Sequence, residues 1–201
     1  MKKLLFCAAM MLLLGMQALP VNAAAAAQPF VRWSVYSAAA GNENALRAAV
    51  AALNTALQNS EGVLAVYGGE DENGVMRYLE IYTDENAFNA AQNNANVKTA
   101  AVQALKLAQV HKTLAADAFN LQSKLSGTAD KARMALLATT ETARPNVFHL
   151  LELYTDDTAY RAHIDGPYFQ EYNKAVQTMV TDKVLIINKP QAVTLSGKNL
   201  K

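Results

Sequence analysis

The chain has 201 residues, with 52% hydrophobic and 17% charged side chains, 18 Lys and Arg, and 17 Asp and Glu. Because basic and acidic side chains are nearly equal in number, the chain has no excess of positive charge with which to bind nucleic acid or an anionic membrane surface. One cysteine, Cys7, and three scattered histidines exclude a disulfide framework and give no metal-site spacing, so we expect no metal and no nucleic-acid partner.

The first residues have the pattern of a secretory signal. A basic start, MKK, is followed by the apolar run LLFCAAMMLLLGMQAL and the small-residue stretch VNAAAAAQ. The run is short for a membrane span, and Cys7 lacks the residues that precede a lipidated cysteine. We therefore expect residues 1–27 to be removed and the protein to be periplasmic or secreted, without a membrane anchor. Loss of Lys2 and Lys3 leaves 16 basic against 17 acidic side chains.

The next elements alternate between strand and helix patterns. FVRWSVYS (30–37) is rich in β-branched and aromatic residues and predicts a strand. In residues 45–59, Leu46, Val50, Leu53 and Leu57 share one stripe, which predicts a helix. The runs GVLAVYGG and VMRYLEIYT flank the turn ENG, so residues 62–83 predict a β-hairpin.

A capped helix and a closing strand complete this first unit. Asp84 is placed to cap a helix that runs to about Leu107, and Glu85 adds favourable negative charge to its first turn. Residues 114–127 then predict an extended segment. The order is β-α-β-β-α-β over residues 28–127.

Part of this unit recurs 72 positions later. LEIYTDENAFNAA (79–91) and LELYTDDTAYRAH (151–163) keep one register, with His163 at the place of Ala91. Residues 132–141 and 146–155 predict a second hairpin, a helix starts at Asp157, and KVLIINKPQAVTLSG (183–197) predicts a closing strand. The segment 128–201 has no room for an opening strand and helix. This second unit is either truncated or borrows a strand from residues 114–124.

Much of the repeat is explained by folding alone, because Thr-Asp caps and alternating strands are what such a unit needs. Glu80 and Glu152 fit that explanation less well, since each lies inside a strand between apolar neighbours. We interpret both as partly exposed acids paired across the sheet, in preference to a catalytic role.

The stretch Glu152–Tyr172, ELYTDDTAYRAHIDGPYFQEY, resembles the antibiotic-biosynthesis monooxygenase superfamily, and the first half follows that family's element order. The resemblance implies an α+β fold of ferredoxin-like units whose sheets close into a barrel. Two tandem units, the second incomplete, would form an internal pseudo-dimeric α/β barrel. Family members include cofactor-free oxygenases of quinols and polyketide phenols, haem-degrading monooxygenases, and proteins with no known activity.

The chain departs from the family pattern at several positions. Tyr82 and Tyr154 stand where the family commonly has Trp, the first strand has no Asn, and Tyr168 stands where a second histidine is expected. The resemblance carries over His163 as the catalytic residue, with Glu152 as its companion.

The second copy is also the more aromatic one. It offers Tyr160, His163, Tyr168, Phe169 and Tyr172 where the first copy has Phe88, Ala91, Asn96, Val97 and Ala100. Large amphipathic rings around one titratable group suit a flat aromatic ligand. We therefore predict a pocket beside the second copy, lined by these side chains with Glu152 and Tyr154. A histidine bonded to a backbone carbonyl or exposed to solvent explains His163 equally well, and we give His111, in a helix-to-strand joint, and His149 lower odds.

Two functions follow as hypotheses. The first is a periplasmic cofactor-independent monooxygenase for a small aromatic or quinol, needing no cofactor, with His163 as general base. The second is a non-catalytic module that binds a small apolar ligand, haem included, or that only forms homo-oligomers.

Overall fold

The computed structural model describes residues 29–122, 133–187 and 194–197. Its elements in chain order are β1 (Phe30–Ala38), α1 (Glu43–Gln58), β2 (Val63–Glu70), β3 (Met76–Tyr82), α2 (Glu85–Asn93), α3 (Ala95–Leu107), β4 (Ala108–Gln122), β5 (Arg133–Glu141), β6 (Arg144–Tyr154), α4 (Asp157–Asp165), α5 (Pro167–Val176) and β7 (Thr194–Gly197). The expected signal segment, residues 1–27, lies outside the described residues.

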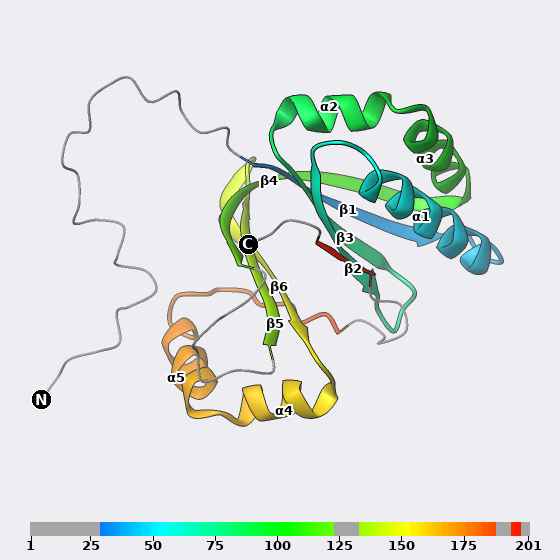
Figure 1. The fold of residues 1–201 in the computed structure, drawn as a ribbon. Coiled ribbons are helices and arrows are strands. Elements are labelled where there is room, and N and C mark those ends of the chain that lie inside the picture. The colour runs from blue at the N-terminus through cyan, green and yellow to red at the C-terminus, as the bar shows by residue number, and fades with distance from the viewer. Residues whose placement is uncertain (1–28, 123–132, 188–193, 198–201) are drawn as a thin grey trace, which may run out of the picture.

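The first half is a ferredoxin-like unit. Its strands lie in the order β4-β1-β3-β2, and β1 is antiparallel to both β3 and β4. Helices α1, α2 and α3 cover one face of these strands (Figure 1). The α+β, ferredoxin-like fold expected from the sequence is confirmed.

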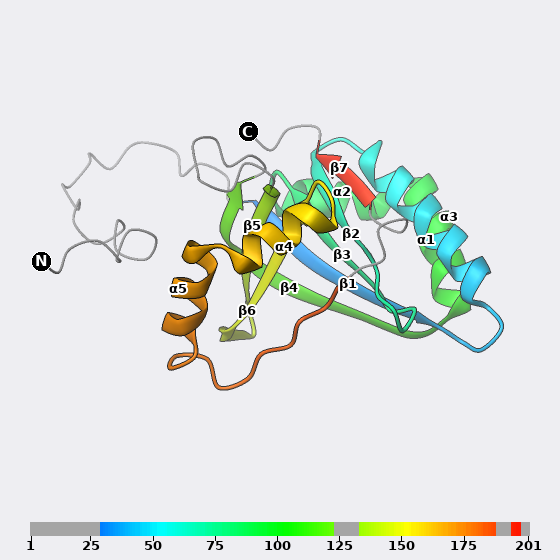
Figure 2. The same cartoon turned by 90° about the horizontal axis from the view of Figure 1, so that it is seen from below.

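The sheet continues beyond this unit into a curled sheet of seven strands, in the order β6-β5-β4-β1-β3-β2-β7. The long strand β4 joins the two halves, as Figure 2 shows. Residues 108–116 of β4 pair with β1, and residues 116–122 pair with β5. Strand β7 pairs with β2, so β6 and β7 are the two end strands.

Two apolar cores hold the sheet. Between sheet and helices, the predicted stripe of Leu46, Val50, Leu53 and Leu57 is buried against Tyr78 and Tyr82. The opposite face packs side chains from both halves of the sheet, including Trp33, Leu79, Leu137 and Leu151. Because the second core draws on β1, β3, β5 and β6, the two halves share buried apolar surface.

The two repeated helix starts have the same cap. Asp84 Oδ1 accepts a hydrogen bond from Ala87 N, and Asp156 Oδ1 accepts one from Ala159 N, both at 2.8 Å. The helix predicted to run from Asp84 to Leu107 is broken at Asn94. The Asn94 side chain accepts bonds from Asn96 N and Val97 N and so caps α3 separately.

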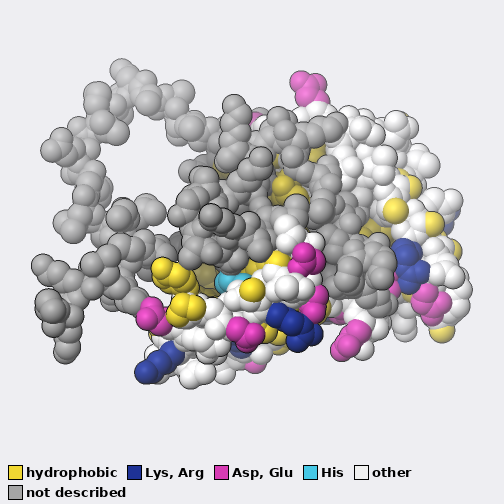
Figure 3. All heavy atoms as spheres, turned by 60° about the horizontal axis from the view of Figure 1, so that its bottom comes forward, with side chains coloured by type: hydrophobic (Ala, Val, Ile, Leu, Met, Phe, Trp, Pro, Cys, Tyr) yellow, Lys and Arg dark blue, Asp and Glu magenta, His cyan; other side chains and the backbone are white. Residues whose placement is uncertain are grey.

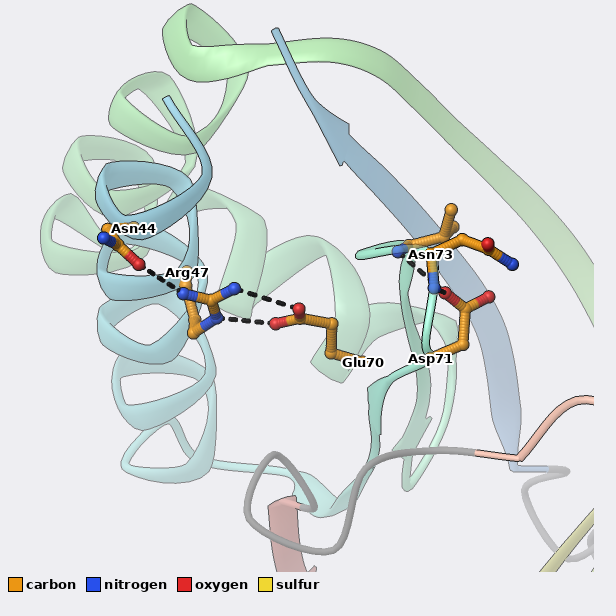
Figure 4. A network of polar contacts seen from close by, with 6 residues as sticks. Asn44, Arg47, Glu70, Asp71 and Asn73 are labelled. Atoms are coloured by element: carbon orange, nitrogen blue, oxygen red, sulfur yellow. Dashed lines mark hydrogen bonds and ion pairs between the residues drawn. The ribbon is translucent and has the colours of Figure 1, made fainter. Parts of the chain in front are cut away.

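Charged side chains fix the β2–β3 hairpin against α1. Glu70, which is buried, receives two hydrogen bonds from the Arg47 guanidinium, at 2.6 and 2.9 Å (Figure 4). Asp71 accepts bonds from Asn73 N and Val75 N and pairs with Arg77 at 2.6 Å. These carboxylates are already used for holding the turn and the helix together.

Both predicted closing strands differ from the structure. Strand β4 begins at Ala108, earlier than the expected residue 114, because β1 offers a partner along its whole first half. Of the expected strand 183–197, residues 183–187 form no strand, 188–193 lie outside the described residues, and only Thr194–Gly197 pairs with β2. Among the described helices, none is both long and apolar enough to cross a membrane.

Candidate functional site

A cluster of aromatic rings lies at the junction of β6, α4 and α5. Tyr154, at the end of β6, contacts Tyr160 with a centroid distance of 5.4 Å and His163 with one of 5.3 Å. His163 contacts Phe169 edge-on at 5.0 Å, and Phe169 contacts Tyr172 at 6.2 Å. The imidazole is thus held between a phenol ring and a phenyl ring.

Glu152 is linked to the same cluster. The Tyr154 hydroxyl donates a hydrogen bond of 3.1 Å to Glu152 Oε2. Burial, and then the negative charge of Glu152, raise the pKa of Tyr172. We call Glu152, Tyr154, Tyr160, His163, Phe169 and Tyr172 the His163 cluster.

The local sequence explains why these rings meet. Asp156 starts α4 directly after β6, which places Tyr160 and His163 one turn apart on the side of Tyr154. Gly166 then ends α4, its N–H bonded to the His163 carbonyl at 3.0 Å, and Pro167 begins α5. This turn brings Phe169 and Tyr172 back to the imidazole.

Not every predicted residue joins the cluster. Tyr168 is 71% exposed and lies outside the chain of ring contacts. Two hollows on the described surface lie along α3, one of about 780 Å³ between α1 and α3, and the second copy lines neither of these two. The side chains of the His163 cluster converge beside the second copy, and the pocket that we expect there stays a prediction.

Glu80, the counterpart of Glu152, lies in a different setting. It is 2% exposed and accepts hydrogen bonds from Arg32 at 3.1 and 2.7 Å, from Ser34 at 2.5 Å and from the Tyr82 hydroxyl at 2.6 Å. The predicted pairing across the sheet is confirmed, but the predicted partial exposure is wrong. Arg32, which alternates with apolar residues in the first strand, was the signal that this acid is buried.

The charge of Glu80 also sets the protonation of its neighbours. Burial and the Glu80 carboxylate raise the pKa of Tyr36 to about 12 and also raise the pKa of Tyr82. Burial acts to lower the pKa of Arg32, but the charge of Glu80, the hydrogen bonding to Glu80 and further Coulombic interactions together more than offset burial, so this pKa is raised. The first copy thus holds a buried ion pair beside neutral phenols, a stabilising arrangement with its acid already fully bonded.

The second copy is open where the first is covered. Met76 and Tyr78, beside Glu80 on β3, are 2% and 6% exposed, whereas their counterparts Phe148 and Leu150 on β6 are 61% and 52% exposed. Strand β1 and helix α1 cover the first pair, and the described residues of the second copy include no counterpart of either element. Figure 3 shows apolar side chains gathered beside a histidine on the face that carries α4 and α5.

The other two histidines lie away from this cluster. His111 was expected in a helix-to-strand joint but lies within β4, where it stacks on Tyr36 at 4.7 Å; burial, and then Arg32, lower its pKa. His149 Nε2 lies 2.9 Å from Glu141 Oε1 and its ring is near Trp33, on the opposite face of β6 from Glu152. Within the described ranges, no three His, Cys, Asp or Glu side chains are grouped as metal ligands.

Comparison with known proteins places the fold. No curated protein matches this chain. A candidate monooxygenase from Fusobacterium nucleatum has a TM-score of 0.73 at 17% identity, over 87% of this chain and 94% of its own. A second, from Lactobacillus acidophilus, has a TM-score of 0.70 at 13% identity, over 84% and 94%. At such identities the likeness is one of fold.

The family assignment comes from the sequence of the first copy. Residues 29–103 match the model of the family described as antibiotic biosynthesis monooxygenase. The match ends before Glu152–Tyr172, the stretch in which the resemblance was strongest. Residues 29–103 are therefore similar in sequence to the antibiotic biosynthesis monooxygenase family.

Proposed function

We propose that the chain is a periplasmic or secreted, cofactor-independent monooxygenase that acts on a small aromatic phenol or quinol at the His163 cluster. The observation that supports this most is the position of His163 between Tyr154 and Phe169, at centroid distances of 5.3 and 5.0 Å. This arrangement presents one titratable group among rings on which a flat substrate stacks.

The chemistry begins with proton transfer. His163 takes a phenolic proton from the bound quinol, and the electron-rich anion reacts directly with O₂. Quinol and O₂ together become a hydroxylated quinone and water, so the substrate supplies all the electrons and one oxygen atom enters the product. The Tyr154–Glu152 pair fixes the phenol ring that lies against the imidazole.

Binding without turnover is the second candidate, and the openness of the second copy favours it. Phe148 and Leu150 are exposed beside the cluster, and catalysis by a desolvated anion benefits from the exclusion of water. A module of this kind would bind a small apolar ligand, haem included, and release it unchanged.

The test measures turnover and stability on one variant. Purified protein is incubated with a panel of hydroquinones while oxygen consumption is followed, and ligand binding is measured separately. We expect His163→Ala to lower turnover by a factor on the order of a hundred or more, the usual worth of a general base, with little change in melting temperature. His111→Ala is the control, because the His111 ring also contacts a tyrosine ring but lies in the first copy.

Two results contradict the proposal. If His163→Ala lowers the melting temperature and leaves turnover or binding unchanged, then the histidine is structural. If the wild-type protein binds the quinols but consumes no oxygen with any of them, then the binding module is the correct function.

A further inference from the structure

Exposed apolar side chains are concentrated in the second copy. Of the thirteen large hydrophobic residues that are exposed among those described, ten lie between residues 148 and 187. They fall mainly on β6, on α5 and on the extended segment 183–187. A concentration of exposed large apolar side chains is characteristic of an interaction site.

Strand β6 has a free edge among the described residues. Its counterpart in the first copy, β3, is paired on one side with β2 and on the other with β1. Strand β6 is paired with β5 and then ends the sheet. The backbone groups along such an edge are a template for another strand.

The segment 183–187, KVLII, has a strand-forming sequence but no strand partner among the described residues. The first half of β4, which follows the helices of the first copy, pairs with β1. Residues 183–187 follow the helices of the second copy at the corresponding place, yet they form no strand within the described structure. Val184, Leu185, Ile186 and Ile187 are all exposed, although this composition strongly favours a strand.

The two features match in register. In the first copy, Arg32 of β1 lies opposite Glu80 in an antiparallel pair, Ser34 opposite Tyr78, and Tyr36 opposite Met76. An antiparallel strand that places Lys183 opposite Glu152 places Leu185 opposite Leu150 and Ile187 opposite Phe148 by counting along the two strands. One cation then faces one carboxylate, and apolar residues face the exposed apolar pair.

The direction of the strands selects a second molecule of this chain as the donor of the added strand. Strands β3 and β4 are both antiparallel to β1, so they run parallel to each other. The same connection in the second copy would bring the chain's own segment 183–187 alongside β6 in the parallel direction. A segment from another molecule is not bound by this connection and can meet β6 in the antiparallel direction with Lys183 opposite Glu152.

We propose that two copies of this chain associate by exchanging segments 183–187, each of which adds as an antiparallel strand to the free edge of β6 of the other. Each chain carries both complementary features, which is the requirement for a twofold symmetric interface. The added strand covers Phe148 and Leu150 and brings Lys183 of the donor molecule to Glu152 in the His163 cluster of the acceptor molecule.

Little in the single chain opposes this exchange. Lys183 Nζ lies 3.5 Å from the exposed Asn173 amide oxygen and 5.9 Å from the centre of the Phe169 ring. Both contacts are long and open to solvent, so their loss is small beside the burial of the apolar segment.

A disulfide between two separately prepared variants tests the register. With Cys7 replaced by Ser, each variant has one thiol, at Leu150→Cys or at Leu185→Cys. Directly opposed residues in an antiparallel pair have Cα atoms within the range that a disulfide spans. Mixed and oxidised, the two variants are expected to form the cross-linked heterodimer rapidly, and sedimentation of the wild-type protein should show a dimer.

Val102→Cys mixed with Leu185→Cys is the control, because Val102 on α3 is 50% exposed and Leu150 is 52% exposed. Equal rates for the two mixtures would overturn the proposal, as would a wild-type protein that sediments as a monomer at every concentration. A charge exchange gives a second readout. Lys183→Glu should weaken the dimer and the double variant with Glu152→Lys should restore it, whereas failure to restore it would reject this register.

Discussion

At the scale of single residues, surroundings decide the role of a repeated side chain. Glu80 and Glu152 occupy the same place in two copies of one pattern. Strand β1 lies beside β3 and surrounds Glu80 with Arg32 and Ser34, whereas no described strand lies at the corresponding side of β6. The same residue type therefore forms a buried ion pair in the first copy and belongs to a partly exposed aromatic cluster in the second copy.

This difference predicts unequal stability losses. Replacing Glu80 by Gln leaves the Arg32 guanidinium without its carboxylate inside the sheet, and breaking a buried pair in this way typically costs about 3–5 kcal/mol. Glu152→Gln should cost much less, because Glu152 is partly exposed. Urea unfolding of both variants measures the two losses, and equal values would contradict a structural role specific to Glu80.

At the scale of elements, the best-predicted features were those fixed by neighbours in the sequence. The spacing of Leu46, Val50, Leu53 and Leu57 located α1, and the Thr-Asp pairs located the starts of α2 and α4. The break at Asn94 was missed, although the asparagine-rich run QNNAN (92–96) contains the residue type that commonly caps a helix.

The repeated caps yield a prediction at this scale. Asp84→Ala and Asp156→Ala each remove a 2.8 Å hydrogen bond to a backbone N–H in the first helical turn, and each should cost about 1 kcal/mol. The Asn variants keep an acceptor at the same place and serve as controls. Thermal unfolding of the four proteins checks this, and losses as large in the Asn variants would show that the carboxylate charge matters more than the cap.

At the scale of the whole molecule, the repeat allowed the fold class to be predicted but not the pairing of its strands. Whether residues 114–124 would serve as an opening strand for the second copy depended on contacts far apart in the sequence. In the structure residues 116–122 of β4 pair with β5, whereas an opening strand would have to lie beside β6, as β1 lies beside β3. The His163 cluster was predictable because β6, α4 and α5 are consecutive. The openness beside it arises because the described residues of the second copy include no counterpart of β1 or α1.

Export is the remaining expectation for the whole chain. The basic MKK start, the apolar run and the alanine stretch that follows predict removal of Met1 to between about Ala23 and Ala27. Strand β1 begins at Phe30, so cleavage in this range leaves every described element intact. Intact-mass analysis of protein recovered from the periplasm or the medium measures the new N-terminus, and a change of the alanine run to bulky residues should slow processing. Recovery of a chain that retains Met1 would contradict both the cleavage and the periplasmic or secreted location proposed for the enzyme.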